Sequence, residues 1–210
     1  MWLMISFAIT VHNEGDYLQT LLNELIPFCH NSGDEIVILD DFSTDELTTS
    51  LLSAYSEDSV VSVYQKKFEG NFSDHKNYLN QQCSGDYIFQ IDADERLHPI
   101  LLNNIGSILE ANPEIDLFLV PRINTVDGLT QEDINRWGWR VNEKGWVVFP
   151  DYQTRIYRNR PNEIMWKNKV HERIMGHKTQ ANLPAEEEWC IIHEKTIERQ
   201  RAQNEYYESL

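Results

Sequence analysis

The feature that most constrains the fold is the alternation of short apolar runs with helical patterns over the first 120 residues. Between the runs, leucines recur at intervals of three and four, which is the spacing of one helix face. Strands that alternate with helices predict an α/β fold with a doubly wound, mostly parallel sheet. The expected strands are residues 3–10, 35–41, 60–64, 86–91 and 115–120.

Two of the expected helices have start signals. Asn13 is placed to cap the helix that follows the first strand. Ser43 and Glu46 have the spacing of a capping box, and the helix behind them would turn Leu47 toward the core.

The composition changes after Pro121, where Trp, Arg, Gly and Asn become frequent. Short strand candidates follow at QTRIYR, EIMWK and EWCIIH, and the last 17 residues form a charged, helical stretch that is either a partner helix or a frayed end. We expect one compact domain with a small C-terminal subdomain. Its regions are 1–121, 122–193 and 194–210.

Charge is spread unevenly along the chain. The net charge of −16 argues against sequence-independent nucleic-acid binding. Between residues 136 and 178, however, ten Lys and Arg stand against four Asp and Glu, which favours an anionic ligand over a solvated face. The same segment holds four of the six tryptophans, whose flat faces suit sugars or bases; a small subdomain core is the alternative. They are Trp137, Trp139, Trp146 and Trp166.

The sequence favours a cytoplasmic protein. No apolar run approaches the roughly 20 residues of a membrane span, and the start, MWLMISFAIT, lacks a basic segment and reads as a strand rather than a signal peptide. Cys29, Cys83 and Cys190 are far apart and form no CxxC pair, which favours reduced thiols.

Acidic residues gather where predicted strands end, which is where open α/β sheets bind ligands. Asp40 and Asp41 follow the second strand and could accept hydrogen bonds from a nucleobase or a ribose; helix capping is the alternative for Asp41. Asp92 and Asp94, in QIDADE, are two residues apart and so leave an extended backbone on one side. Two such carboxylates suit Mg²⁺ or Mn²⁺, and the cation would hold a diphosphate.

These residues resemble family 2 glycosyltransferases of the GT-A fold, which is Rossmann-like. The matching stretches are ITVHNEGDYLQTLL, DEIVILDDFSTD, residues 70–95, GWVVFPDYQTRIYRN, KNKVHERIMGH and IIHEK. Short lipopolysaccharide-core-type and tailed-phage members are the most similar. The resemblance implies an inverting enzyme that uses a nucleotide sugar, often UDP-linked, with Mn²⁺ or Mg²⁺.

The resemblance also assigns roles by position. Asp40 would read the base, Asp92 would contact ribose or a metal-bound water, and Lys76 would lie near base or phosphate. Asp94 and His193 would be the metal ligands; without the resemblance, His193 would read as structural. The implied nucleotide-binding set is Val11, Asn13, Glu14, Asp40, Asp41, Lys76 and Asp92.

The acceptor half departs from the family pattern, because PDYQTR and VHER stand where an ED and a QxxRW motif are usual. Inversion needs a group that takes the acceptor proton, and the candidates are Asp151 and Glu172, with His171 behind them. Arg155 and Arg173 could hold the diphosphate or an anionic acceptor group; structural ion pairs are the alternative. The long connection at 122–146 reads as an acceptor-side flap that carries Trp137 and Trp139.

The sequence therefore predicts a metal-dependent, inverting glycosyltransferase. Its acceptor would be a phosphorylated glycan or, if the chain is phage-encoded and acts in the host cytoplasm, a hydroxymethylated base in DNA. A nucleotidyltransferase is one alternative, although TVHNEGD lacks the glycine-rich basic loop such enzymes show. A non-catalytic nucleotide-sugar-binding protein is another, and it would tolerate the loss of both Asp151 and Glu172. The oligomeric state is not predicted.

Overall fold

The computed structural model describes residues 3–208, with side chains described through Glu205. Within these residues the strands form a nine-stranded sheet and a separate antiparallel pair, β8 (Met165–Lys167) and β9 (Arg173–Met175). The strands of the large sheet are β1 (Ile5–Val11), β2 (Glu35–Asp40), β3 (Val61–Gln65), β4 (Tyr87–Asp92), β5 (Glu95–Leu97), β6 (Leu117–Asp127), β7 (Asp151–Arg158), β10 (Gln180–Asn182) and β11 (Ile191–Thr196). Their order is β3-β2-β1-β4-β7-β6-β11-β5, with β10 paired to β6.

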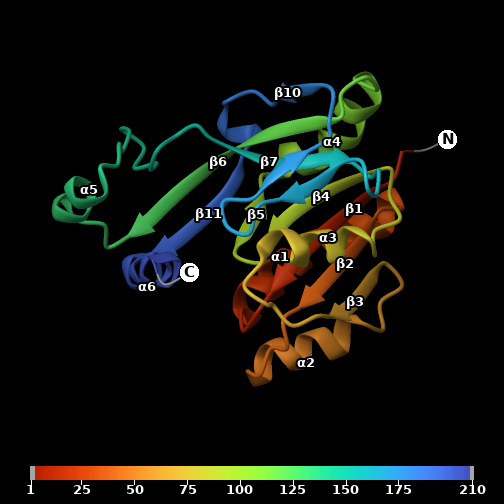
Figure 1. Cartoon of the computed structure of the whole chain (residues 1–210), viewed down its shortest axis with the longest axis horizontal. Coiled ribbons are helices and arrows are strands. Elements are labelled where there is room, and N and C mark those ends of the chain that lie inside the picture. The colour runs from red at the N-terminus through yellow and green to blue at the C-terminus, as the bar shows by residue number, and fades with distance from the viewer. Residues whose placement is uncertain (1–2, 209–210) are drawn as a thin grey trace.

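Most neighbouring strands are parallel, which confirms the predicted sheet (Figure 1). β1 pairs in parallel with β2 and β4, β2 with β3, and β6 with β11. β7 is antiparallel to both of its neighbours, β4 and β6. Its first residue, Asp151, therefore lies toward the edge of the sheet at which β4 ends.

Helices cover both faces of the sheet. On one face, α1 and α4 pack against alternate residues of β1, such as Phe7 and Ile9. On the other face, α3 and the β8–β9 pair pack in a second cluster that includes Ala8. Because successive residues of β1 enter opposite layers, apolar side chains are buried on both faces of the strand. The helices are α1 (Gly15–Ser32), α2 (Glu46–Tyr55), α3 (Phe72–Asn80), α4 (Pro99–Ala111), α5 (Gln131–Trp137) and α6 (Ile197–Glu208), with a 3₁₀ turn at Glu187–Trp189.

The start of α1 differs from the prediction. Its N-cap is Glu14, whose side chain makes no capping hydrogen bond, and not Asn13. Asn13 has a φ of 54° and instead accepts hydrogen bonds at Oδ1 from the backbone N–H groups of Thr44 (2.7 Å) and Asp45 (3.1 Å). Asn13 therefore joins the loop after β1 to the loop after β2.

The predicted capping box of α2 is also wrong. Asp45 is the N-cap and accepts a 2.8 Å hydrogen bond from the backbone of Thr48. Ser43 Oγ accepts from the backbone N–H of Asn13 instead. With this start, Leu47 is 39% exposed rather than turned toward the core.

The long strand β6 runs through Pro121, so the change of composition at that residue lies inside a strand. Beyond β6, the segment that carries α5 projects from the sheet, and α6 lies beside the ends of β6 and β11 (Figure 1). Arg201 of α6 donates hydrogen bonds to Asp133 of α5 at 2.9 and 3.1 Å, which ties the projecting segment to the C-terminal helix. Within the described residues, no helix has the length and apolar composition that a membrane crossing requires.

Candidate active site

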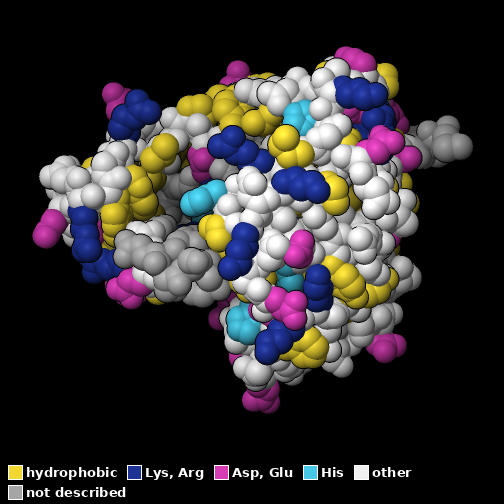
Figure 2. Space-filling model, in the orientation of Figure 1, with side chains coloured by type: hydrophobic (Ala, Val, Ile, Leu, Met, Phe, Trp, Pro, Cys, Tyr) yellow, Lys and Arg dark blue, Asp and Glu magenta, His cyan; other side chains and the backbone are white. Residues whose placement is uncertain are grey.

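A cavity of about 700 Å³ opens at the edge of the sheet where β1 and β4 end. Residues of β6, β7, β8, β11, α3 and α6 line it as well, together with loop residues at 139–148 and 170–172. In Figure 2 this face is hollowed between the projecting segment and the body of the sheet, with Lys, Arg and His side chains beside the hollow. The position is the one at which open α/β sheets bind ligands.

Ten of the predicted site residues line this cavity. They are Glu14, Lys76, Asp92, Asp94, Trp139, Asp151, Arg155, His171, Glu172 and His193. The other six do not line it: Val11, Asn13, Asp40, Asp41, Trp137 and Arg173.

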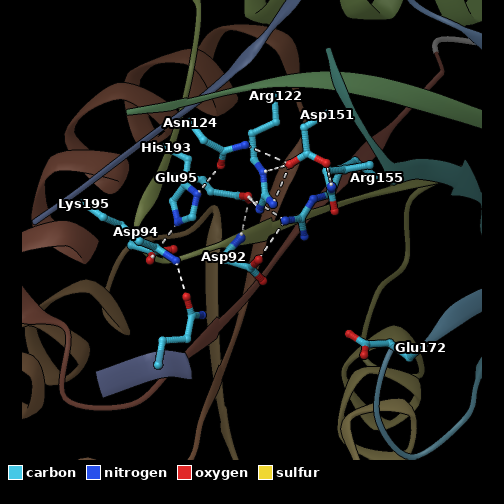
Figure 3. Close-up of polar contacts among 12 residues, drawn as sticks. Asp92, Asp94, Glu95, Arg122, Asn124, Asp151, Arg155, Glu172, His193 and Lys195 are labelled. Carbon is cyan, nitrogen blue, oxygen red and sulfur yellow. Dashed lines mark hydrogen bonds and ion pairs between the residues drawn. The ribbon is translucent and has the colours of Figure 1, made fainter. Parts of the chain in front are cut away.

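A chain of alternating charges crosses the cavity floor (Figure 3). Arg155 donates from Nη2 to Asp92 Oδ2 at 2.7 Å and to Glu95 Oε1 at 2.6 Å. Arg122 donates from Nη1 to the same Glu95 oxygen at 2.9 Å, and from Nε and Nη2 to Asp151 Oδ2 at 3.0 and 2.8 Å. Burial alone would raise the pKa of Asp92, but the Arg155 guanidinium holds it well below the ordinary value. The network fixes where these carboxylates point.

Asp94 and His193 face each other at the end of this network. His193 Nε2 lies 3.2 Å from Asp94 Oδ2, and His193 Nδ1 lies 2.8 Å from Asn124 Oδ1. Since an amide oxygen only accepts, Nδ1 is the protonated nitrogen of this contact, and Nε2 is aimed at the carboxylate. Asn124 also donates from Nδ2 to Asp151 at 2.9 Å, so one amide orients both His193 and Asp151.

This donor pair is consistent with a divalent cation. A carboxylate and an imidazole whose other nitrogen is held by an amide form a common arrangement of metal ligands. No group of three or more His, Cys, Asp or Glu suited to a metal comes together among the described residues. Two protein ligands are nevertheless enough where substrate phosphates and water complete the shell, as is usual for Mg²⁺.

Arg199 of α6, which the sequence did not single out, contacts the same carboxylate. Its Nη2 lies 3.0 Å from Asp94 Oδ2 and also forms an ion pair with Glu14 at the end of the first loop. The guanidinium lies over the ring of Tyr17, 4.6 Å from its centre. Arg199 therefore joins α1, the turn after β4, and α6.

The second candidate base lies on another part of the wall. Glu172 accepts a 2.6 Å hydrogen bond from Lys76 Nζ, which lies 4.5 Å from the centre of the Trp166 ring. Figure 3 shows Glu172 apart from the cluster around Asp151. The neighbouring His171 is exposed and has a φ of 54°.

Asp40 and Asp41, at the C-terminal end of β2, form hydrogen bonds with the adjacent loops. Asp40 is buried and accepts at its two oxygens from the backbone of Ser43 and from Gln65 Nε2, both at 2.9 Å. Asp41 accepts from the backbone of Phe68 at 2.6 Å. Their predicted nucleotide contacts remain predictions.

In the connection between β6 and β7, Trp139 lines the cavity and Trp137 packs against Trp139, with ring centres 4.6 Å apart. Arg173 is exposed on β9. Arg155 is 3% exposed, so its ion pairs are internal, as in the structural alternative.

Sequence reasoning assigned no role to five residues of the site, although Glu95 stood out as a carboxylate in QIDADE. Two of them carried a signal, because Arg122 and Asn124 are polar residues two apart that follow an apolar strand, the same pattern as Asp92 and Asp94. Arg199 had no comparable signal. The five are Glu95, Arg122, Asn124, Lys195 and Arg199.

Comparisons with known proteins agree with this geometry. The family model described as Glycosyl transferase family 2 matches residues 6–202. Lipopolysaccharide core biosynthesis glycosyltransferase LpsC of Rhizobium meliloti (strain 1021) is 28% identical over 182 residues, which cover 82% of this chain and 57% of LpsC. Glycosyltransferase SunS of Bacillus phage SPbeta is 26% identical over 145 residues, which cover 67% of this chain and 32% of SunS. The chain thus spans about half of LpsC and a third of SunS.

The fold is shared with a solved structure. The crystal structure of S. aureus TarS 1–349 in complex with UDP-GlcNAc superposes with a TM-score of 0.63 at 18% identity, covering 93% of this chain and 59% of that one. The predicted GT-A fold is therefore confirmed.

Proposed function

The chain belongs to glycosyltransferase family 2, and we propose that it is a metal-dependent, inverting enzyme that moves a sugar from a nucleotide donor to an acceptor hydroxyl. The observation that carries this proposal is the 3.2 Å approach of His193 Nε2 to Asp94 Oδ2 in the cavity at the strand ends. These two atoms, with Asn124 behind the imidazole, would hold Mn²⁺ or Mg²⁺. The bound cation would offset the negative charge of the donor diphosphate.

The donor is proposed to be a UDP-sugar. A cavity of about 700 Å³ has the size of a small-molecule site. TarS, whose fold this chain shares, was crystallised with UDP-GlcNAc. Lys76, Glu14 and Asp92 line the cavity. Lys76 would provide a cation on the α3 wall, and Glu14 and Asp92 would provide hydrogen-bond acceptors for ribose hydroxyls.

We assign Asp151 as the base. In the proposed reaction an acceptor hydroxyl attacks the anomeric carbon and gives its proton to Asp151, while the bond from that carbon to the diphosphate oxygen breaks. Asp151 shares Asn124 with His193, so it lies next to the proposed leaving-group site, whereas Glu172 pairs with Lys76 away from it. Burial alone would raise the pKa of Asp151, but Arg122 and Asn124 hold that pKa below its ordinary value, so the carboxylate carries no proton at neutral pH.

The acceptor is proposed to be a phosphorylated glycan. Support comes from the basic segment at residues 136–178, from Trp139 at the cavity wall, and from the similarity to a lipopolysaccharide-core enzyme. Hydroxymethylated DNA is the alternative acceptor, since a phage relative exists. Transfer assays on both acceptors at low salt distinguish the two, and the absence of any transfer to hydroxymethylated duplex DNA removes that alternative.

We propose a cytoplasmic location for the enzyme. The three buried, unpaired cysteines fit a reducing cytoplasm.

The first experiment is a calorimetric titration of UDP into the protein, with and without Mn²⁺. We expect micromolar binding that needs Mn²⁺ and is lost in Asp94→Ala. Glu110→Ala, an exposed position on α4, is the matched control and should bind as the unaltered chain does. Binding that is indifferent to Mn²⁺ and to Asp94 would refute the metal-dependent function.

A further inference from the structure

We propose that Arg199 occupies the cation position of the donor-free enzyme and moves to the donor diphosphate when metal and nucleotide bind. By this exchange the bare cation binds weakly and the cation–nucleotide complex binds well. The inference deepens the proposed function and rests on it.

The contacts of Arg199 place a positive charge where a metal ion would be needed. Its Nη2 lies 3.0 Å from Asp94 Oδ2, the oxygen that also lies 3.2 Å from His193 Nε2. A cation bound by that oxygen would lie about 2.1 Å from it. The metal and the guanidinium therefore compete for one carboxylate oxygen, and each one repels the other.

Arg199 can leave Asp94 without leaving the cavity. The guanidinium lies over Tyr17, 4.6 Å from the ring centre, and keeps an ion pair with Glu14. Its side chain is 33% exposed, so it is free to change its hydrogen-bond partners. Stacking holds the group at the mouth of the cavity while its donors turn.

A nucleoside diphosphate supplies the new partner. A guanidinium presents a planar fork of donors that matches phosphate oxygens as well as it matches a carboxylate. The other two arginines of the cavity are held differently. Arg122 and Arg155 each bridge Glu95 and a second carboxylate on the cavity floor. Both carboxylate partners of Arg199, by contrast, are predicted ligand-binding residues.

The chain provides a matched control on the same helix. Arg201 lies two residues beyond Arg199 and pairs with Asp133 on α5, and neither lines the cavity. Loss of Arg201 removes a charge and an ion pair from α6 without touching Asp94. It therefore reports what general weakening of α6 does to binding.

The test measures two affinities in each variant: Mn²⁺ alone, by electron paramagnetic resonance, and UDP at saturating Mn²⁺, by calorimetry. In Arg199→Gln we expect Mn²⁺ alone to bind about fivefold tighter, the size of one lost ion pair, and UDP to bind about tenfold weaker. Arg199→Lys keeps the charge but not the fork, so Mn²⁺ affinity should stay near that of the unaltered chain while UDP affinity falls. Arg201→Gln should change neither.

In Arg199→Gln the Mn²⁺ affinity should rise while the UDP affinity falls. A merely structural role cannot produce these opposite changes, because damage to the site weakens the binding of both ligands. Unchanged or weaker Mn²⁺ binding in that variant overturns the exchange, while the proposed function stands if the unaltered chain binds UDP with Mn²⁺. If the unaltered chain binds neither ligand, the proposed function and this inference both fail. Thermal unfolding identifies any variant that does not fold. If Arg199→Gln does not fold, Arg199→Lys decides: weaker UDP binding with unchanged Mn²⁺ affinity supports the exchange, and equal loss of both affinities overturns it.

Discussion

Glu95 is the residue whose loss should most damage the site from within. Its side chain is completely buried, and it accepts hydrogen bonds from Arg155 at 2.6 Å, from Arg122 at 2.9 Å and from the backbone N–H of Asp92 at 3.0 Å. Glu95→Gln keeps the volume but removes the charge and turns one acceptor into a donor, which then faces either the two guanidinium groups or the backbone N–H of Asp92. The positive charges of Arg122 and Arg155 then lose one of their buried negative partners.

The size of the effect follows from these contacts. Removing one partner of a buried ion pair costs about 3–5 kcal/mol. Here Arg155 keeps Asp92 and Arg122 keeps Asp151, so we expect the lower end, about 3 kcal/mol. For a chain of 210 residues this corresponds to a fall of the unfolding midpoint of about 6–12 °C. Urea titration followed by circular dichroism measures the free energy of unfolding directly.

The matched control is Glu194→Gln, on the strand that pairs with β5. Glu194 is 65% exposed and lies 3.8 Å from Arg96, so its loss should leave the unfolding free energy unchanged within error. A cost below about 1 kcal/mol for Glu95→Gln, or equal effects of the two variants, would show that the network does not depend on this charge.

Three further predictions concern the base, the β8–β9 pair and the thiols. Asp151→Asn should lower kcat about a hundredfold or more with UDP affinity unchanged, and Glu172→Gln should cost less than about tenfold; the reverse order in a transfer assay would make Glu172 the base. Gly176→Ala should cost about 2–3 kcal/mol in urea unfolding, because φ is +92° and the new Cβ would lie 1.8 Å from the Glu163 carbonyl oxygen. Gly106→Ala, in α4 with nothing within 4 Å, should stabilise instead, and similar costs for both would contradict the reasoning. Burial raises the pKa of the thiols of Cys29, Cys83 and Cys190 to about 12. A thiol-reactive disulfide should therefore label none of the three in the folded chain and all of them after denaturation, and rapid labelling of the folded chain would contradict this.

The fold could be predicted because its elements repeat local patterns. The apolar run of β2 is buried on both faces, and the leucines of α1 fall on one helix face, so each element is legible within its own stretch of sequence. The starts of α1 and α2 could not be predicted in this way, because Asn13 and Ser43 each form hydrogen bonds with the other's loop. Local spacing alone does not distinguish a cap from a contact with a loop 30 residues away.

The site residues could be predicted only where polar side chains cluster at the ends of strands. Asp92 and Asp94 follow a strand and stood out by position. Arg199 lies 105 residues from Asp94, and no periodicity reports that pairing. Glu95 was visible as a charge in QIDADE, but its complete burial comes from Arg122 and Arg155, which strands far along the chain bring to it.

The position of β7 has a consequence for exchanging parts between relatives. This strand lies between β4 and β6, and Ile156 is in register with both Phe89 and Phe118. A graft of the second half of the chain onto a foreign first half therefore has to recreate a central seam of backbone pairing rather than a surface join. We expect hybrids to fold only if β4, β6 and β7 come from one parent. Acceptor preference would then be altered more readily by replacing the projecting segment between β6 and β7, whose two ends return to the same sheet.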